Sequence, residues 1–586
     1  MNQTTTLYEL FRNQASQQGD KIAMTYHKAA YLGAFPNEIS YQVYFKVINQ
    51  TMNLFKSVTE KKKPVVATLL PLLPQSQFIM WGAASSGIIL PLNPLLSVEA
   101  LSGLLAHSKA DIVCVFASSE EDPMYEKIAA LKAEHPELVF LSVGKELTSL
   151  DGHYDKLVSE CVDTELTAEE RPAPSDICAY FHTGGTTGLP KIAQQTHASN
   201  IALINMYHDR LPNLDQKTTM NGLPLFHVGG ATLNNLCAYG VGGHVITPHP
   251  LGYRDPETIQ NLWHIIDHYK INTLVAIPTS LGSLCQVDVG DADISSLEYF
   301  LTGGAVVPEA VSSALYDKTG VAVYEIYGMT ETCGGLAIAD VTKAPIPRSA
   351  GKPLAGSKIR IGEGTEPVGS IGEIFFKGPN LFKGYLGKED QSFEEDGWLR
   401  TGDLGCYDEE GHIYLKGRAK DLIIRSGHNI DPVLIEACLE KHPSVAMAAA
   451  VGIPDHYAGE LPIAYIEIAD EAEADLESIK AFARQTIPDR PALPKEIIIL
   501  EELPKTAVGK IYKPELRRMA TMTMIEKHFT QKRLIEYVLL KSSLTKAGLI
   551  DLAVIVYDPE KLEVCQSLSR ELCDLYKLEI DVQQQS

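Results

Sequence analysis

Residues 183–191 carry the sequence Thr-Gly-Gly-Thr-Thr-Gly-Leu-Pro-Lys. The glycines allow backbone N–H groups to approach an anion closely. The threonines add hydroxyl donors, and Lys191 adds a positive charge. The stretch is not a Walker A loop, because Pro190 precedes the lysine and Ile192 follows it, where that motif requires glycine and then serine or threonine. It predicts a phosphate-binding loop; the alternative, a flexible glycine turn, would not need the threonines and the lysine.

Helical and strand-like segments alternate around this loop through most of the chain before residue 415. Residues 7–16 have the apolar spacing of an amphipathic helix, and a helical segment is also expected at 255–269. The strands expected here are 65–70, 112–116, 138–143, 273–278, 299–302 and 321–327. Such alternation is typical of a mostly parallel sheet wrapped by helices. The sequence therefore predicts an α/β fold.

The second part of the chain is divided into smaller blocks. Between residues 351 and 414 glycines recur and strands are short, which predicts a small β-rich subdomain. A separate α+β block follows, and the last residues form an αβ extension in which we find no chemistry. The expected segments are strands 359–361, 373–377, 412–416, 445–453, 463–468, 496–500, 552–557 and 578–582, and helices 432–441, 476–485 and 559–576. We expect a large domain at 1–418, a smaller C-terminal domain at 419–520 and the extension at 521–586.

Composition excludes several classes of protein. The 586 residues are too many for one core, so two or three domains are expected. The net charge of −23 disfavours nucleic acid and anionic membrane surfaces as partners. Ten scattered cysteines without a CxxC pair disfavour a zinc site or a disulfide framework and favour a reducing cytoplasm. The N-terminus has no secretory signal pattern, and residues 78–96 are too interrupted to span a membrane; a buried helix running into a buried strand fits better.

The loop at 183–191 resembles the TSGTTGxPK loop of the adenylate-forming superfamily, which includes acyl-CoA synthetases, luciferase and nonribosomal adenylation domains. Gly184 replaces the commoner serine, so no ligand role is expected for it. Residues 327–332, Tyr-Gly-Met-Thr-Glu-Thr, resemble the second signature of the same superfamily. The resemblance implies phosphate binding by Thr183, Gly185, Thr186, Thr187, Gly188 and Lys191. It also implies that Tyr327 stacks on adenine, that Gly328 lines the site, that Thr330 bonds the α-phosphate and that Glu331 holds Mg²⁺.

Further segments extend the resemblance over residues 5–520. Gly303, Gly304 and Ala305 resemble the segment beside the adenine base, and Asp403 resembles the ribose ligand. Residues 416–421 resemble the hinge of a mobile lid, in which Arg418 reaches the nucleotide and Lys420 absorbs the rotation. Residues 426–430 resemble the lining of the pantetheine channel, where Gly427 leaves room for the thiol arm. Residues 503–511 resemble the C-terminal catalytic loop, in which Lys510 bridges the substrate carboxylate and the α-phosphate.

The resemblance implies an AMP-forming acid–thiol ligase that uses ATP, Mg²⁺ and coenzyme A. Residues 224–230, Pro-Leu-Phe-His-Val-Gly-Gly, contain no carboxylate to pair with a substrate ammonium, which disfavours α-amino acids. His227 resembles the gate of the acyl channel, and the glycines near it and near the second signature suggest room for a longer chain; they are Gly229, Gly230, Gly334 and Gly335. We expect a medium- or long-chain fatty acid as substrate.

Several alternatives stay open at the level of sequence. An aryl acid could replace the fatty acid, and the acceptor could be an acyl carrier protein instead of coenzyme A. A non-catalytic nucleotide sensor is disfavoured because Glu331, Asp403 and Lys510 are all present. Neither the role of the extension nor the choice between monomer and homodimer follows from the sequence. The whole interpretation requires the loop at 183–191 and Lys510 to converge on one triphosphate.

Overall fold

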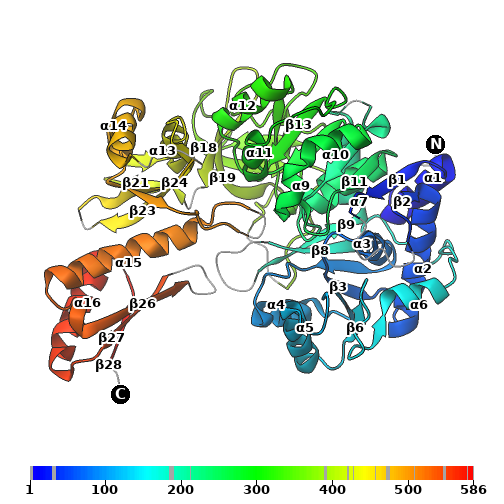
Figure 1. Ribbon diagram of the computed structural model, residues 1–586, viewed down its shortest axis with the longest axis horizontal. Helices are drawn as coiled ribbons and strands as arrows, with labels where there is room; N and C mark the ends of the chain where they lie inside the picture. Colours follow the sequence, from blue (N-terminus) through cyan, green and yellow to red (C-terminus); the bar gives the residue numbers. More distant parts are fainter. Residues whose placement is uncertain are drawn as a thin grey trace.

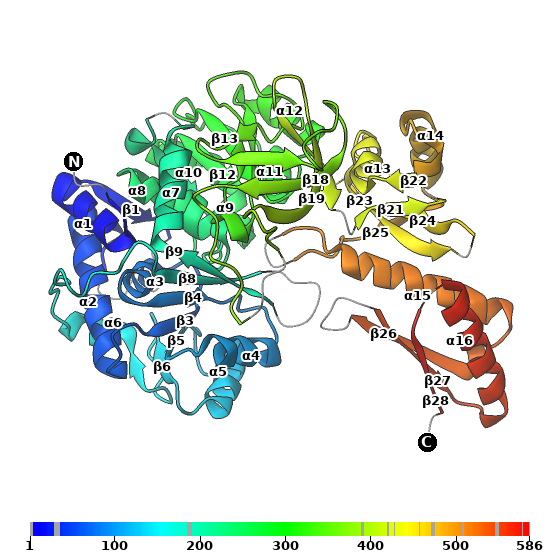
Figure 2. The same cartoon turned by 180° about the vertical axis from the view of Figure 1, so that it is seen from behind.

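The computed structural model describes residues 4–584, except for 29–34, 184–189, 212, 388–391, 419–420, 427, 456, 470–474, 507–508, 545–549 and 577, and except for the side chains of His428 and Asn429. Two large sheets and their helices form one side of the molecule, and the lid and the extension lie on the other side (Figures 1 and 2). The predicted α/β class is confirmed.

The first large sheet has nine strands, most of them parallel. Its strand order is β16-β15-β14-β13-β12-β10-β11-β1-β2, with antiparallel pairing only at the two edges. The strands are β16 (Lys352–Pro353), β15 (Ala337–Ile338), β14 (Val323–Tyr327), β13 (Tyr299–Gly303), β12 (Thr273–Ala276), β10 (Thr218–Asn221), β11 (His244–Thr247), β1 (Ile22–Tyr26) and β2 (Glu38–Ser40).

The second large sheet has seven strands in the order β7-β6-β5-β3-β4-β8-β9, and only the β8–β9 pair is antiparallel. The strands are β7 (Gly152–His153), β6 (Val139–Ser142), β5 (Ile112–Val115), β3 (Val65–Leu69), β4 (Ile88–Pro91), β8 (Ile177–His182) and β9 (Ile192–Thr196). The phosphate loop lies between β8 and β9. Its position at the carboxyl end of a parallel strand is where α/β sheets bind ligands.

Helices pack between and around the two sheets. They are α1 (Leu7–Gln18), α2 (Tyr41–Thr59), α3 (Pro74–Ser86), α4 (Val98–Ser108), α5 (Pro123–Glu134), α6 (Tyr154–Glu160), α7 (His197–His208), α8 (Cys237–Gly240), α9 (Pro256–Gln260), α10 (Leu262–Tyr269), α11 (Pro278–Cys285) and α12 (Glu309–Thr319). A π-helix, η2 (Gly229–Leu236), precedes α8, and 3₁₀ turns occur at η1 (Leu214–Gln216), η3 (Gly252–Arg254) and η4 (Thr330–Thr332). The helix expected at 255–269 is divided at Asn261 into α9 and α10.

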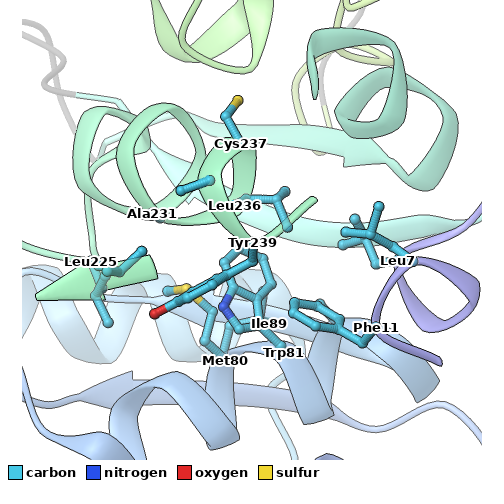
Figure 3. Close-up of a cluster of buried hydrophobic side chains, with 14 of the residues drawn as sticks. Leu7, Phe11, Met80, Trp81, Ile89, Leu225, Ala231, Leu236, Cys237 and Tyr239 are labelled. Carbon is cyan, nitrogen blue, oxygen red and sulfur yellow. The ribbon is translucent and has the colours of Figure 1, made fainter. Parts of the chain in front are cut away.

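The core between the sheets explains the apolar stretch that resembles a membrane span. Every residue of α3 is buried, and the chain then enters β4, as predicted. Phe11 packs its ring 5.9 Å from Trp81 of α3 and 6.5 Å from Tyr239 of α8, measured between centroids. Figure 3 shows these rings together with Leu236. No helix among the described residues is long and apolar enough to cross a membrane.

Three smaller sheets follow along the chain. The β-rich subdomain is an antiparallel sheet of β17 (Lys358–Ile361), β18 (Gly372–Lys377), β19 (Leu399–Tyr407) and β20 (Ile413–Arg418). The lid has the order β22-β21-β24-β23, with β25 also pairing to β24. Its elements are β21 (Ile423–Arg425), β22 (His428–Ile430), α13 (Pro432–Leu439), β23 (Val445–Asp455), β24 (Gly459–Ile468), α14 (Leu476–Thr486), η6 (Arg490–Ala492) and β25 (Glu496–Leu500).

The extension adds a three-stranded sheet covered by two helices on one face (Figure 1). Its elements are α15 (Lys513–Gln531), η7 (Ile535–Tyr537), β26 (Val538–Leu544), β27 (Ile550–Val556), η8 (Pro559–Lys561), α16 (Leu562–Tyr576) and β28 (Ile580–Gln584). Strands β27 and β28 and helix α16 match the predicted segments. The sequence analysis did not predict α15 or β26, and the expected domain boundary at residue 520 falls inside α15.

Candidate active site

The phosphate loop begins and ends on one hydrogen-bonded pair. The backbone N–H of Thr183 donates to the carbonyl of Lys191 at 2.8 Å, so the two ends of the loop are held together. The predicted ligands Gly185, Thr186, Thr187 and Gly188 lie outside the described residues. Before the loop, the His182 ring accepts a hydrogen bond from the backbone N–H of Asn93 at 3.1 Å. Burial lowers the pKa of His182 to about 4, so this ring is neutral near pH 7.

Three strands bring together the residues predicted to hold the nucleoside. Tyr327 ends β14, and its hydroxyl donates to Oδ2 of Asp403 at 2.7 Å. The other oxygen of Asp403, on β19, lies 3.1 Å from Nε of Arg418, at the end of β20. Asp403 in turn raises the pKa of Arg418. These contacts place a carboxylate, a guanidinium and a phenol hydroxyl together at the carboxyl end of β14.

Lys510 reaches the same place from the lid. A Cβ atom added to Gly304 would lie 2.8 Å from Cε and 3.3 Å from Nζ of Lys510, so the lysine stem rests on that glycine. Gly304 also has a φ of +85°, which favours glycine. Burial and the nearby charge of Arg418 lower the pKa of Lys510, while Asp403 opposes the shift. Because Gly304 follows β13, the lid lysine lies over the edge at which β13 and β14 end.

Gly303 and Gly328 permit close packing of backbones. A Cβ atom on Gly303 would lie 2.7 Å from the carbonyl oxygen of Ile326, and one on Gly328 would lie 1.7 Å from that of Gly334. Neither position can accept a side chain. Ala305, the third residue of the predicted adenine segment, is exposed.

Glu331 is a buried carboxylate in the turn η4. Its side chain is 6% exposed, and burial raises its pKa. Within the described part of the chain, no lysine or arginine nitrogen lies within 4.0 Å of it; its hydrogen-bond donor is the hydroxyl of Tyr385. An unpaired buried carboxylate is costly, and oxygen ligands suit Mg²⁺, so this environment fits a divalent cation. Next to it, the Thr330 carbonyl accepts a hydrogen bond from Nε2 of Gln195 at 3.0 Å.

His227 lies two residues before the first residue of the π-helix η2. Its Nδ1 accepts the backbone N–H of Gly229 at 3.1 Å, which leaves the proton of a neutral ring on Nε2. Burial, reinforced by the charge of Lys510, lowers the pKa of His227 to about 3. η2 is eight residues long, and π-helical segments are rare overall but frequent at functional sites.

Two of the glycines predicted to leave room for the acyl chain, Gly230 and Gly335, are closely packed and do not line open space. A Cβ atom on Gly230 would meet the carbonyl oxygens of Pro224 and Leu223 at 2.5 and 2.6 Å. A Cβ atom on Gly335 would lie 2.8 Å from Cδ1 of Leu203. Backbone and core packing therefore account for the absence of a side chain at Gly230 and Gly335. These two glycines do not indicate a roomy acyl pocket, contrary to the expectation from the sequence.

The hinge and channel residues are described only in part. Lys420 and Gly427 lie outside the described residues. Beside the hinge, Asp421 forms an ion pair with Arg517 of α15. The hinge and the helix that follows Lys510 are therefore connected directly.

Two residues at the site were not predicted from the sequence. Tyr385 binds Glu331, and Gln195 fixes the Thr330 carbonyl. Neither lies in a segment that resembles a signature loop. The aromatic and glycine-containing stretch at 381–385, Leu-Phe-Lys-Gly-Tyr, was the available signal for Tyr385.

Two family models match the chain. The family model described as AMP-binding enzyme matches residues 11–386, and that described as AMP-binding enzyme C-terminal domain matches residues 434–510. The chain belongs to the AMP-binding enzyme family. Its predicted resemblance to the adenylate-forming acyl-CoA synthetases is thereby confirmed.

Similar proteins of this family include a marinolic acid–CoA ligase from Pseudoalteromonas sp. (strain SANK 73390), which is 33% identical over 79% of this chain and 73% of the relative. A long-chain-fatty-acid–CoA ligase from Bacillus subtilis (strain 168) is 30% identical over 77% of this chain and 84% of the relative. Among solved structures, the anthranilate CoA ligase AuaEII in complex with anthranoyl-AMP has the same fold, with a TM-score of 0.79 at 22% identity. That match covers 89% of this chain and 98% of AuaEII.

Proposed function

We propose that this acyl-CoA synthetase joins a medium- or long-chain fatty acid to ATP as an acyl-adenylate and then transfers the acyl group to coenzyme A. The observation that carries the proposal is the position of Lys510. Its stem lies on Gly304, and the charges of Arg418 and Asp403 act on its ammonium group, in a chain of the AMP-binding enzyme family. A cation at this point can act on a nucleotide held at the ends of β13 and β14.

In the first half-reaction, the substrate carboxylate attacks the α-phosphorus of ATP and pyrophosphate leaves. Two anions must approach each other, and Lys510 offsets their repulsion as charge develops in the transition state. Asp403 accepts hydrogen bonds from the ribose, Tyr327 stacks on adenine and Arg418 reaches the nucleotide. Thr330 bonds the α-phosphate. No side-chain nucleophile is required.

Glu331 would hold Mg²⁺ beside the phosphates. When bound, the metal would neutralise charge on the leaving pyrophosphate. Lys191, with Thr183 and the residues of the phosphate loop, would bind the same group. Each of these residues acts on the nucleotide only, so their roles do not depend on the acid.

In the second half-reaction, the lid rotates about Lys420 and withdraws Lys510. The Gly427 segment then faces the adenylate, and the coenzyme A thiolate attacks the acyl carbonyl carbon of the mixed anhydride. The C–S bond of the thioester forms, the acyl C–O bond to the phosphate breaks and AMP leaves. The neutral ring of His227 gates the channel between the acyl group and the thiol. Because one site would serve both steps, lid rotation is the event that separates them.

The preference for a fatty acid rests on the chemistry around His227. Residues 224–230 offer no carboxylate, and the buried neighbours Leu225, Phe226 and Val228 are apolar. A substrate ammonium would lose its hydration there without gaining a partner. The name of the Bacillus subtilis relative, a long-chain-fatty-acid–CoA ligase, supports the same choice.

A substrate series tests the proposed acid. Pyrophosphate release is measured with acetate, fatty acids of increasing length, benzoate and an α-amino acid, and acyl-CoA is identified by mass. We expect the highest kcat/KM with a medium- or long-chain fatty acid. A maximum with acetate or the amino acid would refute the proposal, and a maximum with benzoate would favour an aryl-acid ligase. Adenylation without thioester formation on free coenzyme A would favour a carrier-protein acceptor.

Replacement of Lys510 tests the mechanism separately from the identity of the acid. We expect K510A to slow pyrophosphate release roughly 10²–10³-fold, since one group that stabilises the transition state is lost. Thioester formation from supplied acyl-adenylate should change little. The control is K480A, which removes a lysine paired with Glu477 on the exposed side of α14. Equal loss in both half-reactions would contradict the assignment of Lys510 to the first.

A further inference from the structure

Residues 380–386 connect the two signature segments of the nucleotide site. On one side, the backbone N–H of Lys383 donates to the Gln194 carbonyl at 2.8 Å and that of Leu386 donates to the Ile192 carbonyl at 2.9 Å. On the other side, the backbone N–H of Phe382 donates to the Glu331 carbonyl at 2.9 Å. This connecting segment therefore pairs with β9, which leaves the phosphate loop, and with the turn that carries Glu331.

The side chain of Tyr385 contacts a charged group of each signature. Its hydroxyl donates a hydrogen bond to Oε1 of Glu331. Nζ of Lys191 lies over its ring, 4.4 Å from the centroid. The edge-to-face contact with Phe382, at 5.0 Å between centroids, fixes the ring from a third direction. One side chain thus binds an anion through its hydroxyl and a cation through its π face.

This arrangement prevents the two charges from neutralising each other. Lys191 and Glu331 have opposite charges and belong to neighbouring segments, but they do not form an ion pair in the described structure; Lys191 lies on the ring and Glu331 at the hydroxyl. A direct ion pair would occupy both groups. With the tyrosine in contact with both, neither Oε2 of Glu331 nor Nζ of Lys191 has a hydrogen-bond partner among the side chains that the structure describes, so both can bind ligands.

We propose that Tyr385 is a positioning residue for the nucleotide: it orients Glu331 toward a divalent cation with its hydroxyl and holds Lys191 toward the phosphates with its ring. The inference rests on the proposed roles of Glu331 and Lys191. It concerns the binding of ATP and its metal, and it is independent of the acid that the enzyme activates.

The test measures ATP binding by titration calorimetry in the absence of any acid, once with Mg²⁺ and once with EDTA. In Y385F the ring stays and the hydroxyl is lost. We expect its affinity for Mg·ATP to fall roughly 10-fold or more, as is usual when a partner of a metal ligand is removed. Its affinity for metal-free ATP should stay within about twofold of the wild type. In Y385L the ring is also lost, and metal-free ATP should bind about two- to fivefold more weakly.

A double-mutant cycle asks whether the hydroxyl acts through Glu331. E331Q should reduce the advantage of Mg·ATP over metal-free ATP, and adding Y385F to E331Q should reduce it no further. The control is Y407F, which removes another hydroxyl of the β-rich subdomain, bonded to the Ile359 carbonyl at 2.5 Å. Thermal unfolding of every variant checks that the fold is kept.

The outcomes distinguish a failure of the proposed role of Tyr385 from a failure of the proposed substrate. Wild-type affinity of Y385F for Mg·ATP would overturn it. So would equal losses with and without Mg²⁺, which indicate a merely structural role, or a full additional loss in the E331Q background. If the variants bind ATP as expected but no fatty acid is activated, the proposed substrate fails and the role of Tyr385 stands.

Discussion

Gly304 and Lys510 contact each other although one belongs to the large domain and the other to the lid. The glycine has two separate reasons to lack a side chain, namely its φ of +85° and the lysine stem that lies against it. Gly320, at the end of α12, has a similar φ of +71°, but a Cβ atom added there would have no neighbour within 4 Å. Both positions therefore favour glycine by their φ, and Gly304 has the lysine contact in addition.

Alanine at these two glycines separates backbone strain from displacement of Lys510. Both G304A and G320A should lose about 1–2 kcal/mol of stability, the usual cost of a left-handed conformation for an alanine. Only G304A should also slow pyrophosphate release, roughly 10-fold or more, because its methyl group pushes Lys510 away from the nucleotide. Thermal unfolding and steady-state kinetics measure the two effects. Equal kcat values for the two variants would show that the contact does not matter.

Glu325 gives the large domain a stability that depends on pH. This carboxyl is 8% exposed, accepts the backbone N–H of Val307, and has its pKa raised by burial to about 7. The folded state therefore holds the proton more tightly than the unfolded state. The resulting stabilisation is complete below the unfolded pKa near 4.5 and is lost as pH rises through about 7.

Replacement of Glu325 by the neutral glutamine should remove this dependence. We expect the Tm of E325Q to match that of the wild type at about pH 5 and to exceed it at about pH 8, by roughly 2–4 °C for each kcal/mol regained. The control is E309Q, on the exposed first turn of α12. A Tm difference that is constant between the two pH values would contradict the assignment to Glu325.

The sequence predicted residues whose role is local and missed those whose role depends on pairing between distant segments. Lys510, Asp403 and Tyr327 lie in short signature segments, so their convergence could be expected. Tyr385 could not be found in this way, because its contact with Glu331 exists only after the connecting segment pairs with β9. For the same reason, the sequence could not show that Gly230 is packed against Leu223 and does not open a pocket.

At the scale of elements, α15 belongs to two hydrophobic cores. Leu516 and Ala520 in its first half pack with Val451 of the lid, whereas Ile525 and Phe529 in its second half pack with the extension. The alternating apolar pattern of the strands predicted most of the sheets, but α15 is polar on average and its two apolar faces serve different partners. A single amphipathic pattern is therefore weak in this helix, and the apolar spacing does not predict it.

Truncation of Phe529 should loosen the extension selectively. Its side chain is fully buried against residues such as Leu552 and Leu568, so F529A should cost about 3–5 kcal/mol in that core. We expect faster hydrogen exchange across β26, β27 and β28 and unchanged exchange in β8. L575A, at an exposed position on α16, is the control. Exchange that rises equally in the large domain would show that the extension is not a separate cooperative unit.

At the scale of the whole molecule, the lid and the extension are joined to each other more firmly than to the large domain. Helix α15 follows Lys510 directly, lies beneath the lid in both views (Figures 1 and 2) and binds the hinge through the Arg517–Asp421 ion pair. A rotation of the lid that withdraws Lys510 must therefore carry α15 and the extension with it. The position of the extension therefore changes with the position of the lid.

Spin labels can detect this rotation. Tyr316 on α12 and Tyr457 in the lid are both well exposed, so cysteines introduced at these positions can be labelled. Replacement of the partly exposed Cys161, Cys285 and Cys573 by serine limits labelling to the two sites. With ATP and the acid, we expect one distance distribution, set by Lys510 on Gly304. A non-hydrolysable acyl-adenylate analogue with coenzyme A should populate a second distribution, because the lid must then present another face.

The control is a label pair at Tyr316 and Leu251, both in the large domain, whose distance distribution should not change. One unchanged distribution for the first pair under all conditions would contradict lid rotation and require both half-reactions to proceed with Lys510 in place.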